Sequence, residues 1–433
     1  MSIKSFLKSL GPGLITGTAD DDPSSIATFA QAGAKFGLGM LWTVIYLIPL
    51  IIVIQEICAR IGLLTGSGLG TIIKKKYSRK IVLPLISLLL VANAINVGAD
   101  IGAMAASASL MFPQISLNIF SIFFTAFIII AIIMIPYKRY IKILKYLTLS
   151  LLTYIVTALI VGGNWYQILI ATIVPHVEFT ADFATMLVAI LGTTISPYLF
   201  FWQASEEAEE EVVHHKIKEI GKGKPKVSKK EIKSMGTDTM VGIGFAHLIT
   251  WAIIVTTAGS LHDNGITEIQ SAEQAAKSLE PLVQSFPNSG EIAKSIFAIG
   301  IIGTGLLSIP VLATSTAYGL SDTFGWKQGL SQKFGQAKAF YLVIIICGII
   351  GLGMNFLGIN PITALVYASV INGVVSVPII FVVMKLSNDK EILKENTNGR
   401  LTNIIGWTTF VIMSISTIIM FITFWNITIF MGS

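Results

Sequence analysis

Three consecutive carboxylates, Asp20, Asp21 and Asp22, stand inside an otherwise apolar stretch, GTADDDPSSIATF at residues 17–29. Ionisable side chains are costly inside a membrane span, so those found there mark functional sites by default. Pro23 has no backbone donor and disfavours helix in the residue before it, which predicts a helix break at Asp22. Carbonyl groups freed by such a break bind ions in membrane transporters. The stretch therefore predicts a cation site.

A second apolar stretch, TTISPYLFFWQAS at residues 193–205, is interrupted in the same way by Ser196 and Pro197. The two stretches share three short matches, which are Gly17-Thr18, Pro23 and Gln31-Ala32 in the first and Gly192-Thr193, Pro197 and Gln203-Ala204 in the second. Counted in membrane-spanning apolar runs, the second stretch begins five runs after the first. Because an odd number of crossings lies between the two starts, the second stretch enters the membrane from the opposite side, so the second copy has the opposite topology. This pattern predicts an inverted repeat whose first and sixth helices are broken within the membrane.

The two predicted breaks offer oxygen donors of three kinds. The candidate metal ligands are the Asp22 carboxylate, the Ser25 hydroxyl and the Ala19 carbonyl on the first helix, and the Thr193 carbonyl, the Ser196 hydroxyl and the Tyr198 phenol on the sixth. An all-oxygen set suits the hard cations Mg²⁺, Ca²⁺ and Mn²⁺, and a single close carboxylate suits a partly hydrated Mg²⁺ ion. We expect Asp20 and Asp21 to line an aqueous vestibule and attract cations.

Composition indicates the class of protein to which these residues belong. The chain has 433 residues, of which 53% are hydrophobic and 12% charged, and its mean hydropathy is +0.76. Soluble domains carry about 25% charged residues, so a polytopic membrane protein is predicted. Apolar runs near the length of a spanning helix, roughly 20 residues, recur at 10–34, 40–62, 81–107, 115–136, 143–164, 184–206, 237–259, 292–318, 338–357, 361–385 and 403–430.

We therefore predict an all-α integral membrane protein with eleven transmembrane helices in a single domain over residues 1–433. Repeat one is expected at about 9–175, repeat two at about 183–386 and an extra helix at about 403–430. With the N-terminus in the cytoplasm, every Lys and Arg except Lys35, Lys277 and Lys294 falls inside. The positive-inside rule thus predicts a multi-pass cell-membrane protein with a cytoplasmic N-terminus.

An N-terminal signal peptide cleaved after Ala19 is the alternative reading of the first segment, and it would leave the aspartates on a surface. Against it, Gly11-Pro12-Gly13 breaks the apolar core, and apolar sequence resumes directly after Ser25. No phosphate-binding loop, nucleophile triad or nucleotide motif is present, so we expect neither an enzyme nor an ATP-driven pump. The expected partners are a divalent cation as substrate and the lipid bilayer, without a cofactor, nucleic acid or obligate protein partner.

These residues resemble the Nramp family of divalent-metal transporters. GPGLITGTADDDPSSIATFAQAGAKFG at residues 11–37 is similar to the family's first helix, which reads G-P-G, then D-P-G-N, then A-T and Q-A-G-A. Residues 193–205 resemble its sixth helix, which reads M-P-H. The resemblance covers essentially the whole chain and implies a LeuT-like fold. It also implies that Asp22 is the metal-binding aspartate and that Ala19 and Thr193 supply carbonyls.

Departures from the family pattern favour a particular branch. Ser25 stands where the family has asparagine, and Ser196 where it has the metal-binding methionine. Tyr198 and Gln203 replace its two sixth-helix histidines, and Asp100 lies one residue out of register with its third-helix glutamate. Without the thioether and the histidines, the site loses its preference for soft metals and its groups that titrate near neutral pH. The pattern is most similar to the Nramp-related magnesium transporters, a divergent branch that lacks proton coupling.

The expected function is transport of divalent cations, with Mg²⁺ and Mn²⁺ favoured, into the cytoplasm by alternating access without proton coupling. A proton-coupled Mn²⁺/Fe²⁺ transporter that uses Asp20, Asp21 or Asp100 as proton carrier is the first alternative. A sodium-coupled symporter for an organic solute is the second, because a fold does not fix its substrate. A metal sensor without transport is the third.

Several polar residues outside the two motifs carry separate expectations. Glu56 and Arg60 are predicted to form an i,i+4 ion pair. We expect Asp100 to line the ion path, to carry a proton or to have a structural role, with Asn93 and Asn96 as its hydrogen-bond partners. Asn372 is a weaker candidate for a residue that lines the vestibule. The connection from Glu206 to Ser234 is expected to extend the sixth helix and become disordered near 221–225, with His214 and His215 on its solvated surface. Residues 271–283 predict a short amphipathic helix.

Overall fold

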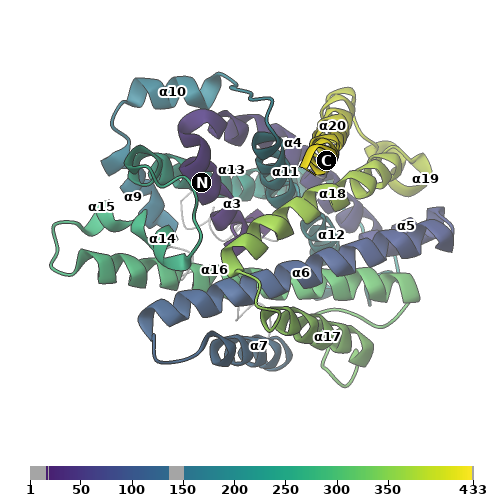
Figure 1. Ribbon diagram of the computed structural model, residues 1–433. Coiled ribbons are helices and arrows are strands. Elements are labelled where there is room, and N and C mark those ends of the chain that lie inside the picture. The colour runs from purple at the N-terminus through teal and green to yellow at the C-terminus, as the bar shows by residue number, and fades with distance from the viewer. Residues whose placement is uncertain (1–15, 18, 136–150, 432–433) are drawn as a thin grey trace.

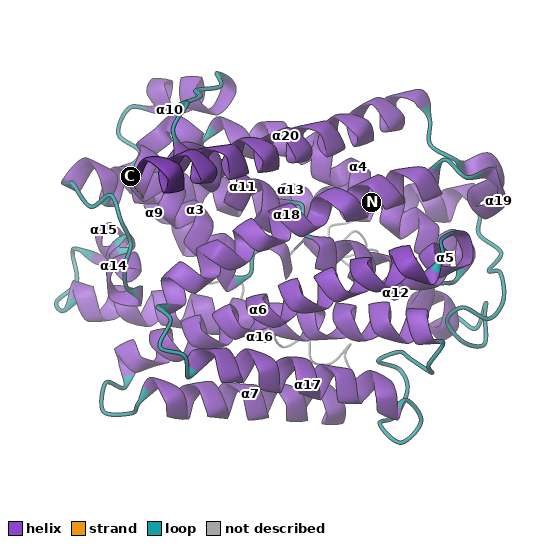
Figure 2. Cartoon of the chain, turned by 45° about the vertical axis from the view of Figure 1, so that its right-hand side comes forward, coloured by secondary structure: helices purple, strands orange, loops and turns teal. Residues whose placement is uncertain are grey.

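The computed structural model describes residues 16–17, 19–135 and 151–431, with side chains described up to residue 423. This described part is almost entirely helical (Figure 2). Its helices are α3 (Pro23–Phe36), η1 (Gly37–Met40), α4 (Trp42–Thr65), α5 (Leu69–Lys76), α6 (Arg79–Met111), α7 (Leu117–Met134), α9 (Leu152–Val161), α10 (Trp165–Ile173), α11 (Ala181–Thr194), α12 (Pro197–Val213), α13 (Lys229–Ser260), η3 (His262–Asn264), α14 (Ala272–Lys277), α15 (Glu280–Val283), α16 (Ser289–Phe324), α17 (Lys338–Asn355), α18 (Pro361–Ser387), α19 (Lys390–Leu393), η4 (Lys394–Asn396) and α20 (Arg400–Met431).

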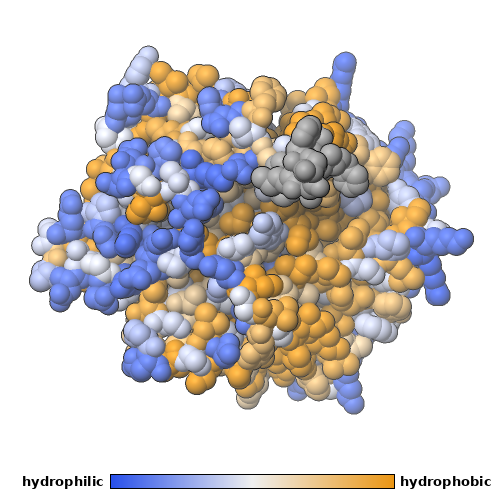
Figure 3. Space-filling model, viewed as in Figure 1, coloured by the Kyte–Doolittle hydropathy of each residue, from blue (hydrophilic) through white to orange (hydrophobic). Residues whose placement is uncertain are grey.

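Within the described residues, nine helical segments are long and apolar enough to cross a membrane, α11 and α12 counting together as one. They coincide with the predicted spans two, three, four and six to eleven. Predicted spans one and five overlap residues 1–15, 18 and 136–150, which lie outside the described residues. Apolar surface crosses the middle of the molecule over α6, α17 and α18, and hydrophilic residues gather at both ends (Figure 3). The multi-pass membrane architecture is therefore confirmed.

The helices pack in two groups. We call α6, α7, α16 and α17 the scaffold, in which these four helices lie against one another (Figure 2). We call α3, α4, α12 and α13 the bundle, in which α3 packs on α13 and α4 packs on both α12 and α13. α18 joins the two groups, because it contacts α6 on one side and α3 and α11 on the other. The bundle holds the second half of each broken helix.

Both predicted helix breaks are confirmed. Residues 19–20 are helical, Asp21 and Asp22 are not, and α3 begins at Pro23. α11 ends at Thr194, and α12 begins at Pro197. Proline suits a first helical position because its missing N–H would have no helical partner there. Gly192 lets α11 approach α18 closely, since a Cβ atom would collide with the carbonyl oxygen of Ser369.

The two ends of the molecule carry different short helices and connections (Figure 1). We call the end that carries α5, α19 and the connections α12–α13 and α16–α17 the basic end. Lys76 of α5 pairs with Asp389 at 2.6 Å there, and Arg60 lies 3.6 Å from Glu56 as predicted. The opposite end carries α10, α14 and α15, and it holds the pair of Lys35 with Asp182 at 2.7 Å.

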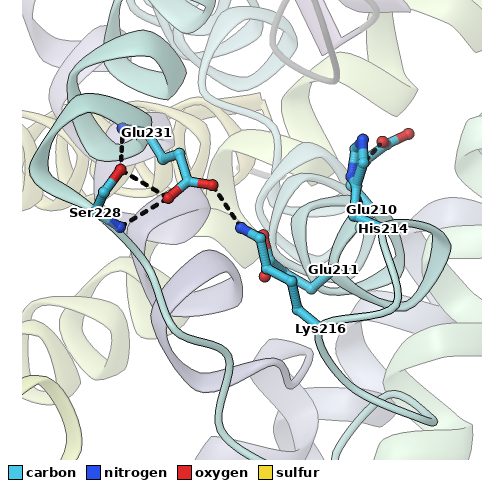
Figure 4. A network of polar contacts seen from close by, with 6 residues as sticks. All are labelled: Glu210, Glu211, His214, Lys216, Ser228 and Glu231. Atoms are coloured by element: carbon cyan, nitrogen blue, oxygen red, sulfur yellow. Dashed lines mark hydrogen bonds and ion pairs between the residues drawn. The ribbon is translucent and has the colours of Figure 1, made fainter.

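The long connection at the basic end departs from its prediction. α12 extends the sixth helix to Val213 as expected, but the segment near 221–225 is ordered, because the Gly221 amide donates to the Gly66 carbonyl at 2.7 Å. Figure 4 shows the hydrogen bonds and ion pairs that stabilise this connection. Lys216 donates to Glu211 at 3.0 Å and to Glu231 at 2.6 Å, and Ser228 and Glu231 form a capping box at the start of α13.

Two surface predictions can also be compared with the structure. His214 and His215 are exposed as predicted, and His214, directly after the end of α12, contacts Glu210 in the last turn of that helix (Figure 4). At the opposite end, the single helix predicted over 271–283 is wrong, since α14 ends at Lys277 and α15 begins at Glu280. Leu279 is buried between them, so the apolar stripe is kept although the helix is interrupted.

Candidate metal site

Asp22 organises the break in the first helix. It has extended backbone angles, φ −71° and ψ 169°, and caps α3 by accepting the Ser25 amide on Oδ1 at 2.7 Å. Ser24 donates its hydroxyl to the same oxygen at 2.6 Å. These contacts use Oδ1 and leave Oδ2 directed at other elements. The predicted ligand Ser25 is thus placed beside Asp22 by its backbone.

Tyr198 brings the two breaks together. Its hydroxyl lies 3.1 Å from the Ala19 carbonyl oxygen and 3.4 Å from Asp22 Oδ2. Pro197 starts α12, which points the next side chain back across the break in the first helix. Three of the predicted ligands, Asp22, Ala19 and Tyr198, therefore meet at one point, and each presents oxygen.

Thr193 and Ser196 are linked to each other. The Ser196 hydroxyl donates to the Thr193 carbonyl at 2.9 Å and to the Gly192 carbonyl at 2.6 Å. It thus satisfies carbonyls that the break in the sixth helix leaves without an N–H partner. From α18, the Ser376 hydroxyl donates to the Ile195 carbonyl at 2.5 Å, and Asn372 lies one turn before it with both side-chain polar atoms buried and unpaired.

The scaffold contributes a residue whose role the sequence analysis assigned differently. Asn96 of α6 donates its amide to Asp22 Oδ2 at 3.2 Å and keeps a buried, unpaired Oδ1. It was expected to pair with Asp100, as was Asn93, which instead donates to Ser315 at 2.9 Å. Both expectations were wrong because each amide finds a partner on a neighbouring helix, which spacing along one helix does not reveal.

Asp100 lies on the same α6 helix and belongs to this neighbourhood. Its Oδ2 accepts the Ser308 hydroxyl of α16 at 3.2 Å, and its Oδ1 is buried without a partner. Its carboxylate also interacts electrostatically with that of Asp22. The scaffold thus places a second carboxylate near the first.

Charge is the main feature of the site. Asp20, Asp21, Asp22 and Asp100 are between 0% and 6% exposed. Among the residues that the structure describes, no Lys, Arg or His forms an ion pair with any of them. Buried carboxylates without a basic partner are stabilised by a cation. Their burial also shows that the vestibule expected at Asp20 and Asp21 is closed.

Contacts on both sides close the site. Towards the opposite end, Gln31 of α3 accepts the Ile269 amide at 2.9 Å and donates to the Thr267 carbonyl at 3.3 Å. Towards the basic end, Thr16 donates to Gln203 of α12, and Gln203 donates to Glu207 at 2.9 Å. The structure therefore shows the aspartates enclosed between the bundle and the scaffold.

No three His, Cys, Asp or Glu side chains of the described residues converge as a metal cage. A cation at Asp22 would instead be held by one carboxylate together with carbonyl, hydroxyl and amide oxygens and its own water molecules. This donor set is the one that hard divalent cations accept.

A family model supplies the identification. The model of the natural resistance-associated macrophage protein-like family, Nramp, matches residues 13–423. The chain belongs to the Nramp family. The match includes both broken helices and every helix of the bundle and the scaffold.

Curated Nramp relatives agree over nearly the full length. The divalent metal cation transporter MntH of Caldanaerobacter subterraneus subsp. tengcongensis is 25% identical over 413 residues, which are 94% of this chain and 90% of the relative. MntH of Ralstonia nicotianae is 24% identical and covers 95% of this chain and 90% of its own. Both relatives are named as divalent metal cation transporters.

Solved structures show the fold. The Eremococcus coleocola manganese transporter superimposes with a TM-score of 0.74 at 15% identity, covering 98% of this chain and 88% of that one. MhsT in complex with L-phenylalanine gives a TM-score of 0.63 at 14% identity, covering 96% and 98%. This Nramp chain therefore has the LeuT-like fold with broken first and sixth helices.

Proposed function

We propose that the chain carries divalent metal cations across the plasma membrane into the cytoplasm by alternating access, with Mg²⁺ and Mn²⁺ favoured and without proton coupling. The observation that carries the proposal is the meeting of Asp22, the Ala19 carbonyl and the Tyr198 hydroxyl at two helix breaks, inside a buried group of carboxylates. The MntH relatives are named as divalent metal cation transporters, which supports the class of substrate.

At the break in the sixth helix, the described residues 193–198 offer oxygen donors and no sulfur, which supports the preference for hard cations. Ser196 occupies the position next to Pro197, and its hydroxyl is already bonded to backbone carbonyls. A soft ligand such as a thioether would favour later transition metals, whereas carboxylate, carbonyl and hydroxyl oxygens favour Mg²⁺ and Mn²⁺. Mg²⁺ dehydrates reluctantly and is therefore suited to a site with one close carboxylate and retained water.

The position of the site suggests how it is exposed to each side in turn. Asp22 and Tyr198 belong to the bundle, whereas Asn96 and Asp100 belong to the scaffold. Rocking of the bundle against the scaffold would open the site first to one end and then to the other. In this proposal, repeat one at about 9–175 and repeat two at about 183–386 form the two inverted halves. The basic end faces the cytoplasm, as the positive-inside rule requires.

The test is uptake into proteoliposomes that hold the purified protein, with Mg²⁺ or Mn²⁺ outside and a pH-sensitive dye inside. Entry of both metals without acidification is the expected result. Acidification that follows Mn²⁺ entry, with no entry of Mg²⁺, would overturn the proposal. Vesicles without protein provide the leak control.

A second candidate is a proton-coupled Mn²⁺/Fe²⁺ transporter. The observation that favours it is Asp100, whose buried Oδ1 has no partner and whose carboxylate interacts with that of Asp22. In that case Asp100→Asn would abolish acidification in the same assay while Asp20→Asn and Asp21→Asn would keep it.

A further inference from the structure

A buried carboxylate at the basic end accepts three hydrogen bonds from other elements. Glu209 of α12 is 6% exposed and follows the break at Ser196 by roughly 20 Å along the helix, at about 1.5 Å per residue. Its Oε2 accepts the Leu330 amide at 3.0 Å, and its Oε1 accepts the Ser331 amide at 2.5 Å. Tyr318 of α16 donates its hydroxyl to Oε2 as well.

The donors form a preshaped anion site. Consecutive backbone amides that converge on one acceptor make a concave site that favours negative charge. Gly329 precedes them with φ +119°, a conformation that residues with a side chain rarely adopt. A Cβ atom there would also lie 3.2 Å from Glu209 Oε1. The connection between α16 and α17 is therefore shaped to bring both amides to this glutamate.

Aromatic packing fixes the third donor. The ring centroid of Tyr318 lies 4.9 Å from that of Phe340 and 6.3 Å from that of Trp202, and all three side chains are buried. Among the described residues, no Lys or Arg forms an ion pair with Glu209, so these three neutral donors alone satisfy its charge.

Glu209 belongs to the bundle, and each of its donors belongs to the scaffold or to the connection between two scaffold helices. α12 packs directly on α16, so opening of the basic end by movement of the bundle away from the scaffold would separate these two helices. That separation breaks all three hydrogen bonds at once and returns the carboxylate to water.

We propose that Glu209 is a gate residue, whose hydrogen bonds to Tyr318, Leu330 and Ser331 hold the basic end closed and must break in each transport cycle. The inference rests on the proposed transport function, but it concerns a conformational equilibrium that can be measured without metal. Weakening these bonds shifts the population towards the form that is open at the basic end.

Ser205 provides the reporter. It lies one turn before Glu209 on α12, is 0% exposed, and faces Gly68 together with Asp322 of α16. In the protein used for the test, the native cysteines Cys58 and Cys347 are replaced by alanine, so that the reagent can react only with the introduced cysteine. That cysteine is Ser205→Cys, a close isostere of the native serine. Reaction of this cysteine with a charged methanethiosulfonate reagent, in metal-free proteoliposomes, then measures separation of α12 from α16.

Glu209→Gln keeps the shape of the side chain but replaces one acceptor oxygen by a donor, so one backbone amide loses its partner. We expect the labelling rate to rise roughly tenfold, because a hydrogen bond to a charged group is lost in the closed form only. Glu210→Gln is the matched control, because Glu210 faces His214 instead (Figure 4). Its labelling rate is expected to equal that of the parent.

Tyr318→Phe removes only the hydroxyl donor and keeps the aromatic packing. It is expected to raise labelling by a smaller factor, and it preserves the test if Glu209→Gln does not fold. An unchanged labelling rate in folded Glu209→Gln, or in folded Tyr318→Phe if the first variant does not fold, would overturn the gate. Failure of Mg²⁺ uptake with increased labelling would overturn the proposed substrate and leave the gate standing.

Discussion

At the scale of single residues, we expect metal selectivity to depend on the residue that precedes the proline of each broken helix. Asp22 supplies the one carboxylate that caps α3, and Tyr198 connects it to the Ala19 carbonyl. Ser196 places a hydroxyl oxygen at the break in the sixth helix. A longer side chain with a soft donor atom would reach the same space from this position. The identity of residue 196 is therefore expected to change which metal is carried without removing the site.

Ser196→Met tests this directly. A thioether next to Pro197 adds a soft ligand, so uptake is expected to shift from Mg²⁺ towards Mn²⁺ or Fe²⁺, roughly tenfold in the ratio of the two rates. Competition between Mg²⁺ and Mn²⁺ in the same vesicles measures that ratio. Unchanged competition would show that residue 196 does not face the ion.

At the scale of elements, proline, periodicity and charge predicted where helices begin, but not what they touch. Pro23 and Pro197 begin α3 and α12 as expected, because a missing donor acts locally. Asn96 was missed as a partner of Asp22, since that contact depends on how α6 packs against the bundle. The fixed position of Gly221 was missed for the same reason, as its partner is the distant Gly66.

Helix α5 illustrates a cap that comes from another element. Its own N-cap residue, Gly68, has no side chain, and Asp322 of α16 accepts the Thr71 hydroxyl at 2.7 Å together with the backbone amides of Gly70 and Thr71 in the first turn. Loss of such a cap costs about 1–2 kcal/mol. Asp322→Ala is therefore expected to lower the melting temperature of the purified protein.

The control for this variant is Asp263→Ala in the short helix η3 at the opposite end, which should leave the melting temperature within error. Equal melting temperatures for both variants would show that Asp322 does not cap α5.

The ion pair between α5 and α19 gives a prediction for pH. The Lys76 ammonium, which lies 2.6 Å from Asp389, lowers the pKa of that carboxyl from its ordinary value of 3.8, and the Glu391 amide lowers it further. A lowered folded-state pKa gives stability that is complete above about pH 4 and is lost as the pH falls through the folded value. Asp389→Asn keeps an acceptor for the cap and removes only the charge.

We expect Asp389→Asn to melt below wild type at pH 7 and the difference to shrink as the pH falls below 4. High salt should reduce the difference at pH 7 too, because Lys76 is half-exposed and its charge is screened. A difference that is independent of both pH and salt would contradict an electrostatic role.

At the scale of the whole molecule, two helix groups enclose a buried negative charge. The bundle supplies Asp22 and Tyr198, the scaffold supplies Asn96 and Asp100, and the contacts Gln31–Ile269 and Thr16–Gln203 close the two sides. The Nramp fold was predictable from the motifs and the inverted repeat. The closure was not, because it is made by single hydrogen bonds between segments that are distant in the sequence.

The most direct test of the account is Mg²⁺ influx through wild type and Asp22→Asn, recorded with a magnesium-sensitive dye inside proteoliposomes. Asparagine still accepts the Ser25 amide, so the cap of α3 and the fold are expected to remain, which the melting temperature verifies. We expect rapid influx through wild type and influx no faster than the empty-vesicle leak through Asp22→Asn. Wild-type influx in a folded Asp22→Asn protein would contradict the claim that this carboxylate binds the transported ion.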